Sequence, residues 1–596
     1  MSCSVQHSLI LCTLVNKPLY RNKKIFMSDQ ANAQKGHPKG LYVLFATEMW
    51  ERFNFYGMRA MLVLFMTKAL LFDQAFASNL YGSYLSLIYL TPLLGGFMAD
   101  RYWGNKRSII AGGIVMAIGE VILFACGTLY KTAPDVSTFL FFSGLGLMIA
   151  GNGFFKPNIS SLVGQLYPRN DHRKDAAYTI FYMGINTGGA LGPFICGLFG
   201  DTGNPADFRW AFLIGGAGMI ISVLVQMLFH KYVTDPDGKI LGQVPANSPK
   251  TILSPIVTIL GLAVLASACI GLLYLDTIYN YLFYLLVACI VIIPTIIFLD
   301  KTLTAVEKSK VIVIFVVCFF VIFFWSAFEQ AGASLTIFAD AQTDRQLGLQ
   351  IPVWLIAVLS AGFLYLIVRL FRKASRNLAA GFDKDLRMAV YGLLLLFAVG
   401  IIIANTYLFS KGLSHITLDE IPASWFQSLN STFVVLFAPF FAWLWLTMGK
   451  KEPSSPTKMA LGLFLLALGY LWIAKGVNNV SPGIKVSMIW LTGMYALHTA
   501  GELCLSPIGM SLVNKLSPLK FSSLLMAIWF TANAFGNKLA GVLSSLYPNE
   551  GKVTSFLGYH MHNLHEFFML FVFMAGIAAI VLFLLTKRLQ KMMEMV

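Results

Sequence analysis

The sequence predicts an all-α protein that crosses a membrane many times, and three observations lead to this fold class. Of the 596 residues, 57% are hydrophobic and only 12% are charged, whereas a typical soluble protein has about 25% charged residues. The mean hydropathy is +0.70. Apolar runs of about 20 residues, the length at which a helix crosses a bilayer, recur along the chain. Too little polar material remains to cover a water-exposed surface.

The apolar runs predict about 16 membrane-spanning helices. In chain order, the predicted spans are 40–69, 77–100, 106–129, 138–165, 174–200, 209–230, 254–276, 279–300, 308–339, 352–371, 388–409, 423–447, 457–475, 484–513, 520–546 and 567–588. A polar stretch at 231–253 separates the sixth span from the seventh. Its Asp-Pro-Asp-Gly run at 235–238 is typical of a linker.

Two very apolar helix pairs, at 254–300 and 352–409, are read as insertions into a twelve-helix plan. The predicted domains are a disordered cytoplasmic N-terminus at 1–37, an N-terminal six-helix bundle at 38–232, a linker with the first inserted pair at 233–307, and a C-terminal six-helix bundle at 308–596 that the second pair interrupts. The apolar patch at 9–15 is too short for a span. Met27 is a second candidate for the translation start, beside Met1.

The basic residues predict which end of each helix faces the cytoplasm. The formal net charge is +16, but the lysines and arginines lie in short connectors, so this charge does not indicate nucleic-acid binding. Every second connector is basic, which is the pattern of cytoplasmic loops. These connectors carry Arg101, Lys106, Arg107, Arg173, Lys174, Lys231, Lys239, Lys301, Lys308, Arg369, Arg372, Lys450, Lys458, Lys515 and Lys520. We therefore expect both termini in the cytoplasm.

The sequence gives no indication of a metal site or a disulfide framework. The eight cysteines form no CxxC pair and no ligand-like spacing, and six of them lie in apolar segments as small core residues. His560, His562 and His565 have ligand-like spacing in a predicted outer loop, but we do not expect them to bind a metal.

Charged side chains inside the predicted spans are the main functional signal. A charge at the bilayer centre costs roughly 2.5–3.5 kcal/mol on insertion scales, so each one needs an explanation. These residues are Glu48, Glu51, Arg52 and Arg59 in the first span, Lys156 in the fourth, Glu329 in 308–339 and Glu502 in 484–513. With the inserted pairs set aside, their spans are the first, fourth, seventh and tenth of twelve. Carriers built from three-helix repeats place central site residues in this way.

These charges have two interpretations. They could form ion pairs that only fix helix packing, but buried ion pairs stabilise a fold poorly compared with apolar replacements. Alternatively, they surround a central site. Glu48 and Arg52 are four residues apart on one helix face, so protonating the glutamate would remove a charge and release its basic partner. Acids and bases on four symmetry-related helices favour this second interpretation.

Three further polar residues in the spans are expected to be structural. Glu120 has no obvious partner, and an interior contact is favoured over a role in transport. His498 and Glu502 are four residues apart, but packing is favoured over a proton relay for His498. Lys538 is near the end of its helix and is expected to extend its ammonium to the membrane interface.

Several motifs resemble those of the proton-dependent oligopeptide transporters, a branch of the major facilitator superfamily. Residues 48–57 read EMWERFNFYG, similar to the family signature ExxERFxYYG, and residues 95–107 (GGFMADRYWGNKR) resemble the loop 2–3 motif of the superfamily. Family-like stretches follow in the family's order at 181–188 (FYMGINTG), 324–330 (FWSAFEQ), 427–430 (QSLN) and 501–507 (GELCLSP). The combination is specific, whereas the loop motif alone is weak.

The resemblance implies a major facilitator fold and a proton-coupled symporter that imports di- and tripeptides by alternating access. It implies proton coupling by Glu48, Glu51 and Arg52, with Lys156 and Glu329 as ion-pair partners. It also implies that Arg59 and Lys156 attract the peptide carboxylate, that Glu502, Asn186 and Asn430 hold the amino terminus, and that Tyr56, Tyr89, Trp325 and Trp529 line side-chain pockets. Opposite charges at the two ends suit a zwitterion, and two or three residues span on the order of 7–10 Å.

The resemblance also implies a bacterial inner membrane as the location, a monomeric functional unit, and no cofactor besides the proton gradient. The pair at 254–300 resembles the extra helices of bacterial members. The pair at 352–409 is unusual for the family, and we expect it at the periphery. Phe55 replaces the first Tyr of the signature, which removes a hydroxyl that could contact the substrate.

Other functions stay open at this point. The carrier could move an amino acid, nitrate or a peptide-like compound, because the Glu48, Glu51 and Arg52 group indicates proton coupling more than it indicates a substrate. A membrane enzyme should show a catalytic constellation, such as paired acids in a loop, and the sequence shows none. A receptor would not need charges on every third helix.

Overall fold

Most of the chain is helical in the computed structural model, which describes residues 36–594 apart from several gaps. The gaps are 169–170, 172, 247, 250–253, 275–277, 378–394, 396–397, 400, 403–404, 407–408, 411, 413, 482 and 549–551. The predicted disordered segment 1–37 and the predicted 388–409 helix lie largely outside the described residues. Within the described residues, eight helical stretches are long and apolar enough to cross a membrane. The predicted class, a helical membrane protein, is confirmed.

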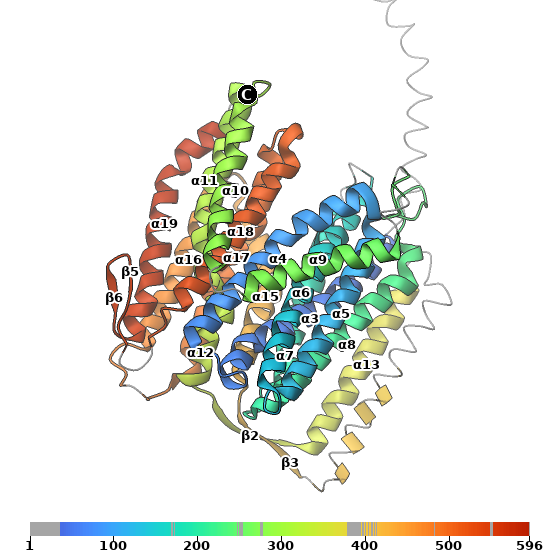
Figure 1. Cartoon of the computed structure of the whole chain (residues 1–596), viewed down its shortest axis with the longest axis vertical. Helices are drawn as coiled ribbons and strands as arrows, with labels where there is room; N and C mark the ends of the chain where they lie inside the picture. Colours follow the sequence, from blue (N-terminus) through green and yellow to red (C-terminus); the bar gives the residue numbers. More distant parts are fainter. Residues whose placement is uncertain are drawn as a thin grey trace, which may run out of the picture. The chain divides into compact units, whose positions relative to one another are not determined.

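Six long helices form the N-terminal group. They are α3 (Lys39–Lys68), α4 (Gln74–Met98), α5 (Gly104–Leu129), α6 (Pro134–Gln165), α7 (Arg173–Gly200) and α8 (Phe208–Phe229). Local chemistry sets several starts: the Asp73 carboxylate accepts from the first backbone N–H groups of α4, and Pro134 fits the first turn of α6. Helix α3 packs against α7 and α8, and α5 packs against α6 and α8 (Figure 1).

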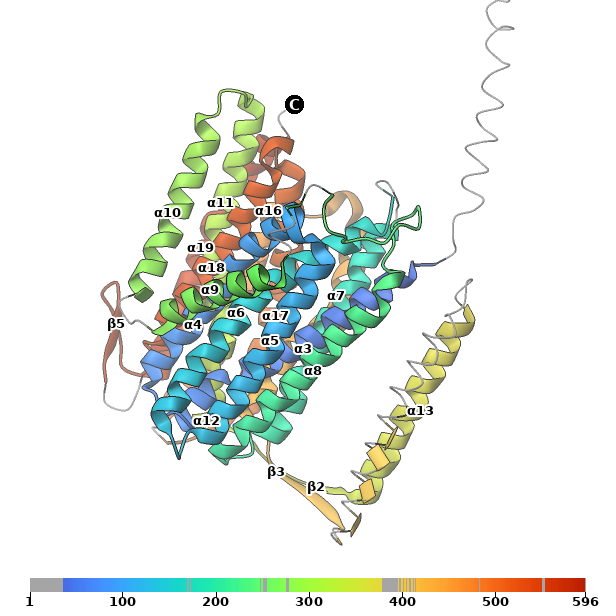
Figure 2. The ribbon, with the colours of Figure 1, turned by 45° about the vertical axis from the view of Figure 1, so that its right-hand side comes forward.

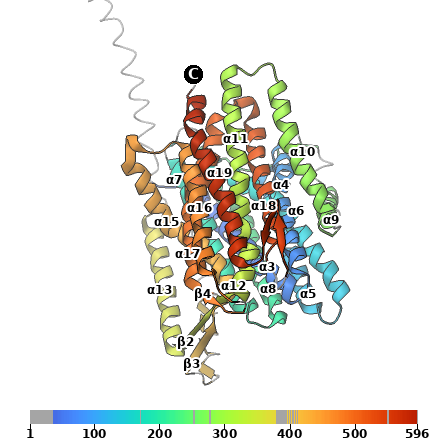
Figure 3. The same ribbon diagram turned by 90° about the vertical axis from the view of Figure 1, so that its left-hand side faces the viewer.

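The C-terminal group also contains six long helices, with a short one after the first. They are α11 (Ala305–Phe328), α12 (Ser334–Ala341), α15 (Phe426–Met448), α16 (Ser455–Gly476), α17 (Met488–Leu516), α18 (Ser522–Ser544) and α19 (Leu564–Met593). Helix α16 packs against α17 and α19, and α11 packs against α18 and α19 (Figure 3). Apart from α11, the long helices of both groups begin and end within a few residues of the predicted spans.

One predicted helix, 308–339, is interrupted. Helix α11 ends at Phe328, a 3₁₀ turn covers Glu329–Gly332, and α12 starts at Ser334. At this break Gly332 lies against the Tyr81 side chain, and an added Cβ there would lie 1.8 Å from the Tyr81 hydroxyl oxygen. The prediction of one continuous helix was wrong here, and the break places Glu329 at the end of α11.

Short strands, which the sequence analysis did not predict, connect the helices. Strand β1 (Thr343–Asp344) pairs in parallel with β4 (Val486–Ser487). Strand β2 (Gln346–Pro352) pairs with β3 (His415–Glu420), and β5 (Thr554–Phe556) forms an antiparallel hairpin with β6 (Tyr559–Met561).

The two inserted regions differ. Helix α9 (Pro255–Tyr274) packs against α6, whereas α10 (Ile278–Leu299) packs against α18, so this pair contacts both six-helix groups (Figure 2). Helix α13 (Val353–Asn377) belongs to a separate compact unit that includes residues 349–418. Within that unit, the Asn405 amide donates a hydrogen bond to Ser360 Oγ at 3.2 Å.

The two ends of the helical bundle are called here the terminal end and the hairpin end. The terminal end carries the start of α3 and the end of α19, and the basic connectors at 101–107, 449–458 and 515–520 lie there. The hairpin end carries α12 and the β5–β6 hairpin. The ribbons of the two six-helix groups approach each other toward the hairpin end and diverge toward the terminal end (Figure 1).

Candidate functional site

Three charged residues of α3 form a compact buried cluster. The Arg52 Nε lies 2.8 Å from Glu48 Oε1 and 2.9 Å from Glu51 Oε2. All three side chains are buried, and Glu51 is fully so. The Asn152 amide of α6 donates to Glu51 Oε1 at 3.1 Å. Two carboxylates therefore share one guanidinium, so a single proton can balance the charge of the cluster.

A second buried ion pair joins the two six-helix groups. Arg59 Nη2 on α3 lies 2.6 Å from Glu329 Oε2, and Arg59 Nε donates to the Tyr81 hydroxyl at 2.7 Å. The Arg59 guanidinium also lies over the Tyr56 ring, 5.7 Å from its centroid. The break in α11 puts Glu329 where it reaches the N-terminal group.

Lys156 on α6 lies next to both clusters. Its ammonium sits over the Tyr89 ring, 4.3 Å from the centroid, and it interacts electrostatically with Glu51 and Glu329. It forms no ion pair within 4.0 Å among the described residues. In this conformation, Glu329 is paired with Arg59, and Lys156 is a cation available to an incoming anion.

Glu502 of α17 has one hydrogen-bond partner among the described residues, and this partner is neutral. The Asn430 amide on α15 donates to Glu502 Oε2 on α17 at 2.9 Å and to Thr499 Oγ1 at 3.1 Å. The Glu502 carboxylate interacts over a longer range with the charges of Glu329 and Arg59. The structure thus brings together Asn430 and Glu502 within the field of the Arg59 and Glu329 charges.

The remaining predicted residues lie as follows. The Asn186 amide donates to the Tyr182 carbonyl of its own helix, α7. Trp325 packs edge-on against Phe328, with 5.3 Å between ring centroids. Trp529 is fully buried, against Gly509 of α17.

Sequence reasoning missed several polar partners. Tyr81 carries no charge and nothing in the local pattern singles it out. Asn152 precedes Lys156 by four residues on the same helix, and this spacing was a usable signal.

Glu120 does have a structural contact, since its Oε1 accepts from the Asn54 amide at 2.6 Å. Lys538 does not reach the membrane interface: it is buried and donates to Ser83 Oγ of α4 at 2.9 Å, so that expectation was wrong.

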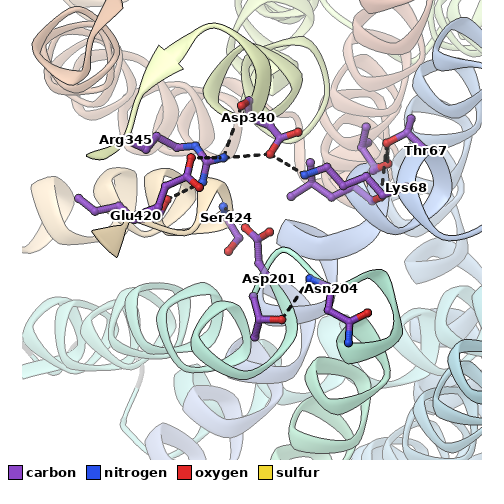
Figure 4. Close-up of polar contacts among 12 residues, drawn as sticks. Thr67, Lys68, Asp201, Asn204, Asp340, Arg345, Glu420 and Ser424 are labelled. Carbon is purple, nitrogen blue, oxygen red and sulfur yellow. Dashed lines mark hydrogen bonds and ion pairs between the residues drawn. The ribbon is translucent and has the colours of Figure 1, made fainter. Parts of the chain in front are cut away.

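Polar contacts tie the two groups together near the hairpin end (Figure 4). Lys68 at the end of α3 lies 2.6 Å from Asp340 of α12, which also pairs with Arg345 at 3.2 Å. Beside them, the Ser424 backbone N–H donates to the Asp201 carboxylate at 3.0 Å.

Helices α4 and α18 also join the two groups near the hairpin end, and small residues line their contact. An added Cβ at Gly541 would lie 2.7 Å from the Ser78 carbonyl oxygen and 2.8 Å from Gly82 Cα. The Ser544 hydroxyl donates to Ser78 Oγ at 3.1 Å. The two helices therefore touch backbone to backbone, and no larger side chain fits between them.

The exposed histidines do not form a metal centre in the described part of the chain. His562 pairs with Glu566 at 3.0 Å, and His565 hydrogen-bonds the Ala474 carbonyl. Among the described residues, no group of three or more His, Cys, Asp or Glu side chains is arranged to hold a metal ion.

Comparison with known proteins identifies the family. A model described as the POT family matches residues 106–409 and 404–558. The chain belongs to the POT family. An uncharacterized transporter, YclF of Bacillus subtilis, is 31% identical over 88% of this chain and 91% of its own length. The di-/tripeptide transporter of Lactococcus lactis subsp. cremoris is 28% identical over 87% of this chain and 92% of its own.

Solved POT structures share the fold. A POT family transporter in complex with a thioalcohol-conjugated peptide superposes with a TM-score of 0.70 at 28% identity, covering 93% of this chain and 97% of that one. The major facilitator architecture implied by the sequence motifs is therefore confirmed, and this chain is a membrane-embedded POT transporter.

Proposed function

We propose that this POT chain is a proton-coupled symporter that imports di- and tripeptides by alternating access. The observation that carries the proposal is the arrangement of charges between the two groups. Lys156 is a half-buried cation with no acid within 4.0 Å among the described residues. Glu502 is a half-buried acid that accepts a hydrogen bond from the neutral Asn430 amide. A zwitterionic peptide supplies the complement of both. The di-/tripeptide transporters among the relatives support this substrate class.

The proposed binding mode follows from these charges. The peptide carboxylate interacts with Lys156 and with Arg59 when its pair with Glu329 opens. The peptide ammonium interacts with Glu502 beside Asn430 and Asn186. The aromatic rings of Tyr56, Tyr89, Trp325 and Trp529 contact side chains. Fixed ends with adaptable walls favour selection by length over selection by sequence.

Proton coupling is assigned to Glu48, Glu51 and Arg52, with Lys156 and Glu329 as alternating partners. Protonation of Glu51 removes one of the two carboxylates that share Arg52, so the guanidinium and Lys156 can redistribute. A buried ion pair that loses one partner is strongly destabilised, by about 3–5 kcal/mol. This is enough to couple a proton to the opening of one side of the bundle.

Orientation and location complete the proposal. The basic connectors support a cytoplasmic terminal end. In this orientation the contacts at the hairpin end close the outer side. We propose a bacterial inner membrane, both termini in the cytoplasm, about 16 spans including the two inserted pairs, a monomeric unit, and no catalytic activity or cofactor besides the proton gradient.

The test is uptake by purified protein in proteoliposomes with an imposed pH gradient, inside alkaline. Dialanine and trialanine should accumulate, whereas tetraalanine and free alanine should not. Uptake of alanine, nitrate or another small solute without either short peptide would overturn the substrate. Accumulation that is the same with and without the gradient would overturn the coupling.

A further inference from the structure

A hollow of about 320 Å³ lies on the N-terminal six-helix group beside the start of α5. It is lined by Trp103, Lys106, Arg107, Ile110, Ile114 and the 242–244 segment of the linker. Its volume is within the range of small-molecule sites. It lies at the terminal end, far along the helices from the Arg59–Glu329 pair, so it is separate from the proposed transport site.

The linker forms one wall of the hollow. The backbone N–H of Lys106 donates to the Gly242 carbonyl at 3.0 Å. Gly242 has a φ of +71°, a conformation that favours glycine. An added Cβ at Gly104 would lie 2.4 Å from the Gln243 carbonyl oxygen. The linker thus wraps closely around the first turn of α5.

Two cations stand at the rim with donor capacity left over. Arg107 donates one N–H to Thr258 Oγ1 of α9 and its guanidinium lies 5.7 Å from the centroid of Trp103. Lys106 forms no ion pair within 4.0 Å in the described part of the chain. None of the lining residues is acidic. Arginine and lysine together are suited to a phosphate group, which accepts several hydrogen bonds at once.

The apolar side of the hollow continues along the membrane-facing surface of α5. Ile110 and Ile114 line the hollow, and Ile118 and Val121 follow on the same helix face. Ile114, Ile118 and Val121 are 44%, 49% and 51% exposed. An exposed apolar stripe on a spanning helix contacts acyl chains in a bilayer. The basic pair Lys106 and Arg107 and the apolar face of α5 together suit an amphiphile with a negatively charged head group.

We propose that this hollow binds an anionic phospholipid. Its phosphodiester lies against Lys106 and Arg107, and one acyl chain runs along Ile110, Ile114 and Ile118. Basic pockets at the cytoplasmic side of spanning helices bind anionic head groups in this way. By holding α5, α9 and the linker, the lipid stabilises the junction of the first inserted pair with the N-terminal group.

The test uses the full chain purified in detergent, with dioleoylphosphatidylglycerol as the probe. Native mass spectrometry gives the apparent Kd of the tightest lipid, and a thermal melt gives the stabilisation. Wild type should prefer phosphatidylglycerol over dioleoylphosphatidylcholine at least tenfold. The K106Q/R107Q variant should lose this preference. Ile114→Trp, which fills the apolar side but keeps both cations, should weaken phosphatidylglycerol binding by a similar factor.

The matched control is K587Q/R588Q. This variant removes two exposed cations near the end of α19, which also lies at the terminal end, and it should bind lipid like wild type. Wild-type affinity in both the K106Q/R107Q and Ile114→Trp variants would overturn the site. Equal binding of phosphatidylcholine would overturn the anionic selectivity. Complete competition by inorganic phosphate at millimolar concentration would show a simple anion site instead of a lipid site. If K106Q/R107Q does not fold, the Ile114→Trp result decides.

Discussion

Arg59 divides its hydrogen bonds between two six-helix groups: one goes to Glu329, directly after α11, and one to Tyr81 on α4. The ion pair is 2.6 Å long and both side chains are almost inaccessible to water. Because water hardly reaches this pair, removal of the Glu329 carboxylate leaves the Arg59 guanidinium buried without a counterion. This costs about 3–5 kcal/mol of stability. This pair therefore favours the state in which the two groups meet at Glu329.

Glu329→Gln should reduce gradient-driven dialanine uptake at least tenfold, because the closed arrangement loses its buried counterion. Proteoliposome uptake measures this effect. Asp135→Asn is the control, since Asp135 is an exposed acid in the first turn of α6 and should transport like wild type. Wild-type uptake by Glu329→Gln would show that the ion pair is not part of the cycle.

Glu502→Gln tests which end of the peptide meets the C-terminal group. The variant should raise the concentration of dialanine needed for half-maximal inhibition of labelled dipeptide uptake about tenfold. N-acetyl-dialanine lacks the ammonium, so its inhibition should be weak and the same in both proteins. If both ligands lose affinity equally, Glu502 does not recognise the amino terminus.

At this scale, the sequence identifies the ionisable residues but not all their partners. Glu48, Glu51 and Arg52 are neighbours on one helix, so their contact follows from helical spacing. Arg59 and Glu329 are 270 residues apart, and only the packing of two groups brings them together. Tyr81 and Asn54 carry no charge, so they do not stand out in the sequence as charged residues inside a predicted span do.

At the scale of helices, α4 and α18 form the tightest contact between the two groups. Gly541→Val places a side chain where an added Cβ already lies 2.7 Å from the Ser78 carbonyl oxygen. Overpacking of this kind costs about 1–3 kcal/mol, which lowers the population of the closed hairpin end relative to the open one roughly 5- to 150-fold. Spin labels at exposed Val136 and Ile489 should report a longer distance by double electron–electron resonance. Gly261→Val is the control, because nothing lies within 4 Å of its added Cβ.

The clasp of Lys68, Asp340 and Arg345 makes a smaller contribution, because its side chains are partly exposed. Exposed and half-exposed ion pairs contribute about 1 kcal/mol or less. Asp340→Asn should therefore raise the open population only a few-fold, measured with the same two labels. Asp419→Asn removes an exposed acid in the neighbouring strand β3 and should leave the distances unchanged. A shift as large as that of Gly541→Val would mean that the clasp, not the helix contact, dominates closure.

Helices and their order could be predicted because each span is a long apolar run with basic flanks. The break after Phe328 was not predicted, although residues 329–332 read Glu-Gln-Ala-Gly. Apolar residues resume after this stretch, and the close approach of Gly332 to Tyr81 of α4 depends on tertiary packing. The short strands were missed for a similar reason. Each of them pairs only two to seven residues, and most of these partners are far apart in the sequence.

For the whole molecule, the charges on the first, fourth, seventh and tenth helices of the twelve-helix plan lie on α3, α6, α11 and α17. The ion pair and long-range interactions of these residues join the two six-helix groups. Contacts at the hairpin end hold the groups together on one side, and their ribbons diverge on the other (Figure 1). Such an arrangement suits a carrier that opens to one side at a time.

Coupling of proton to peptide movement depends on Glu51, the fully buried acid that contacts Arg52 and Asn152. Glu51→Gln keeps the shape and one acceptor oxygen but cannot exchange a proton. The most direct measurement is dialanine transport by this variant in the same proteoliposomes, with and without a pH gradient. Gradient-driven accumulation should fall to the level of empty liposomes, whereas exchange of labelled for unlabelled dialanine should continue at a rate near that of wild type. Accumulation that persists in Glu51→Gln would contradict the proposed coupling by this cluster.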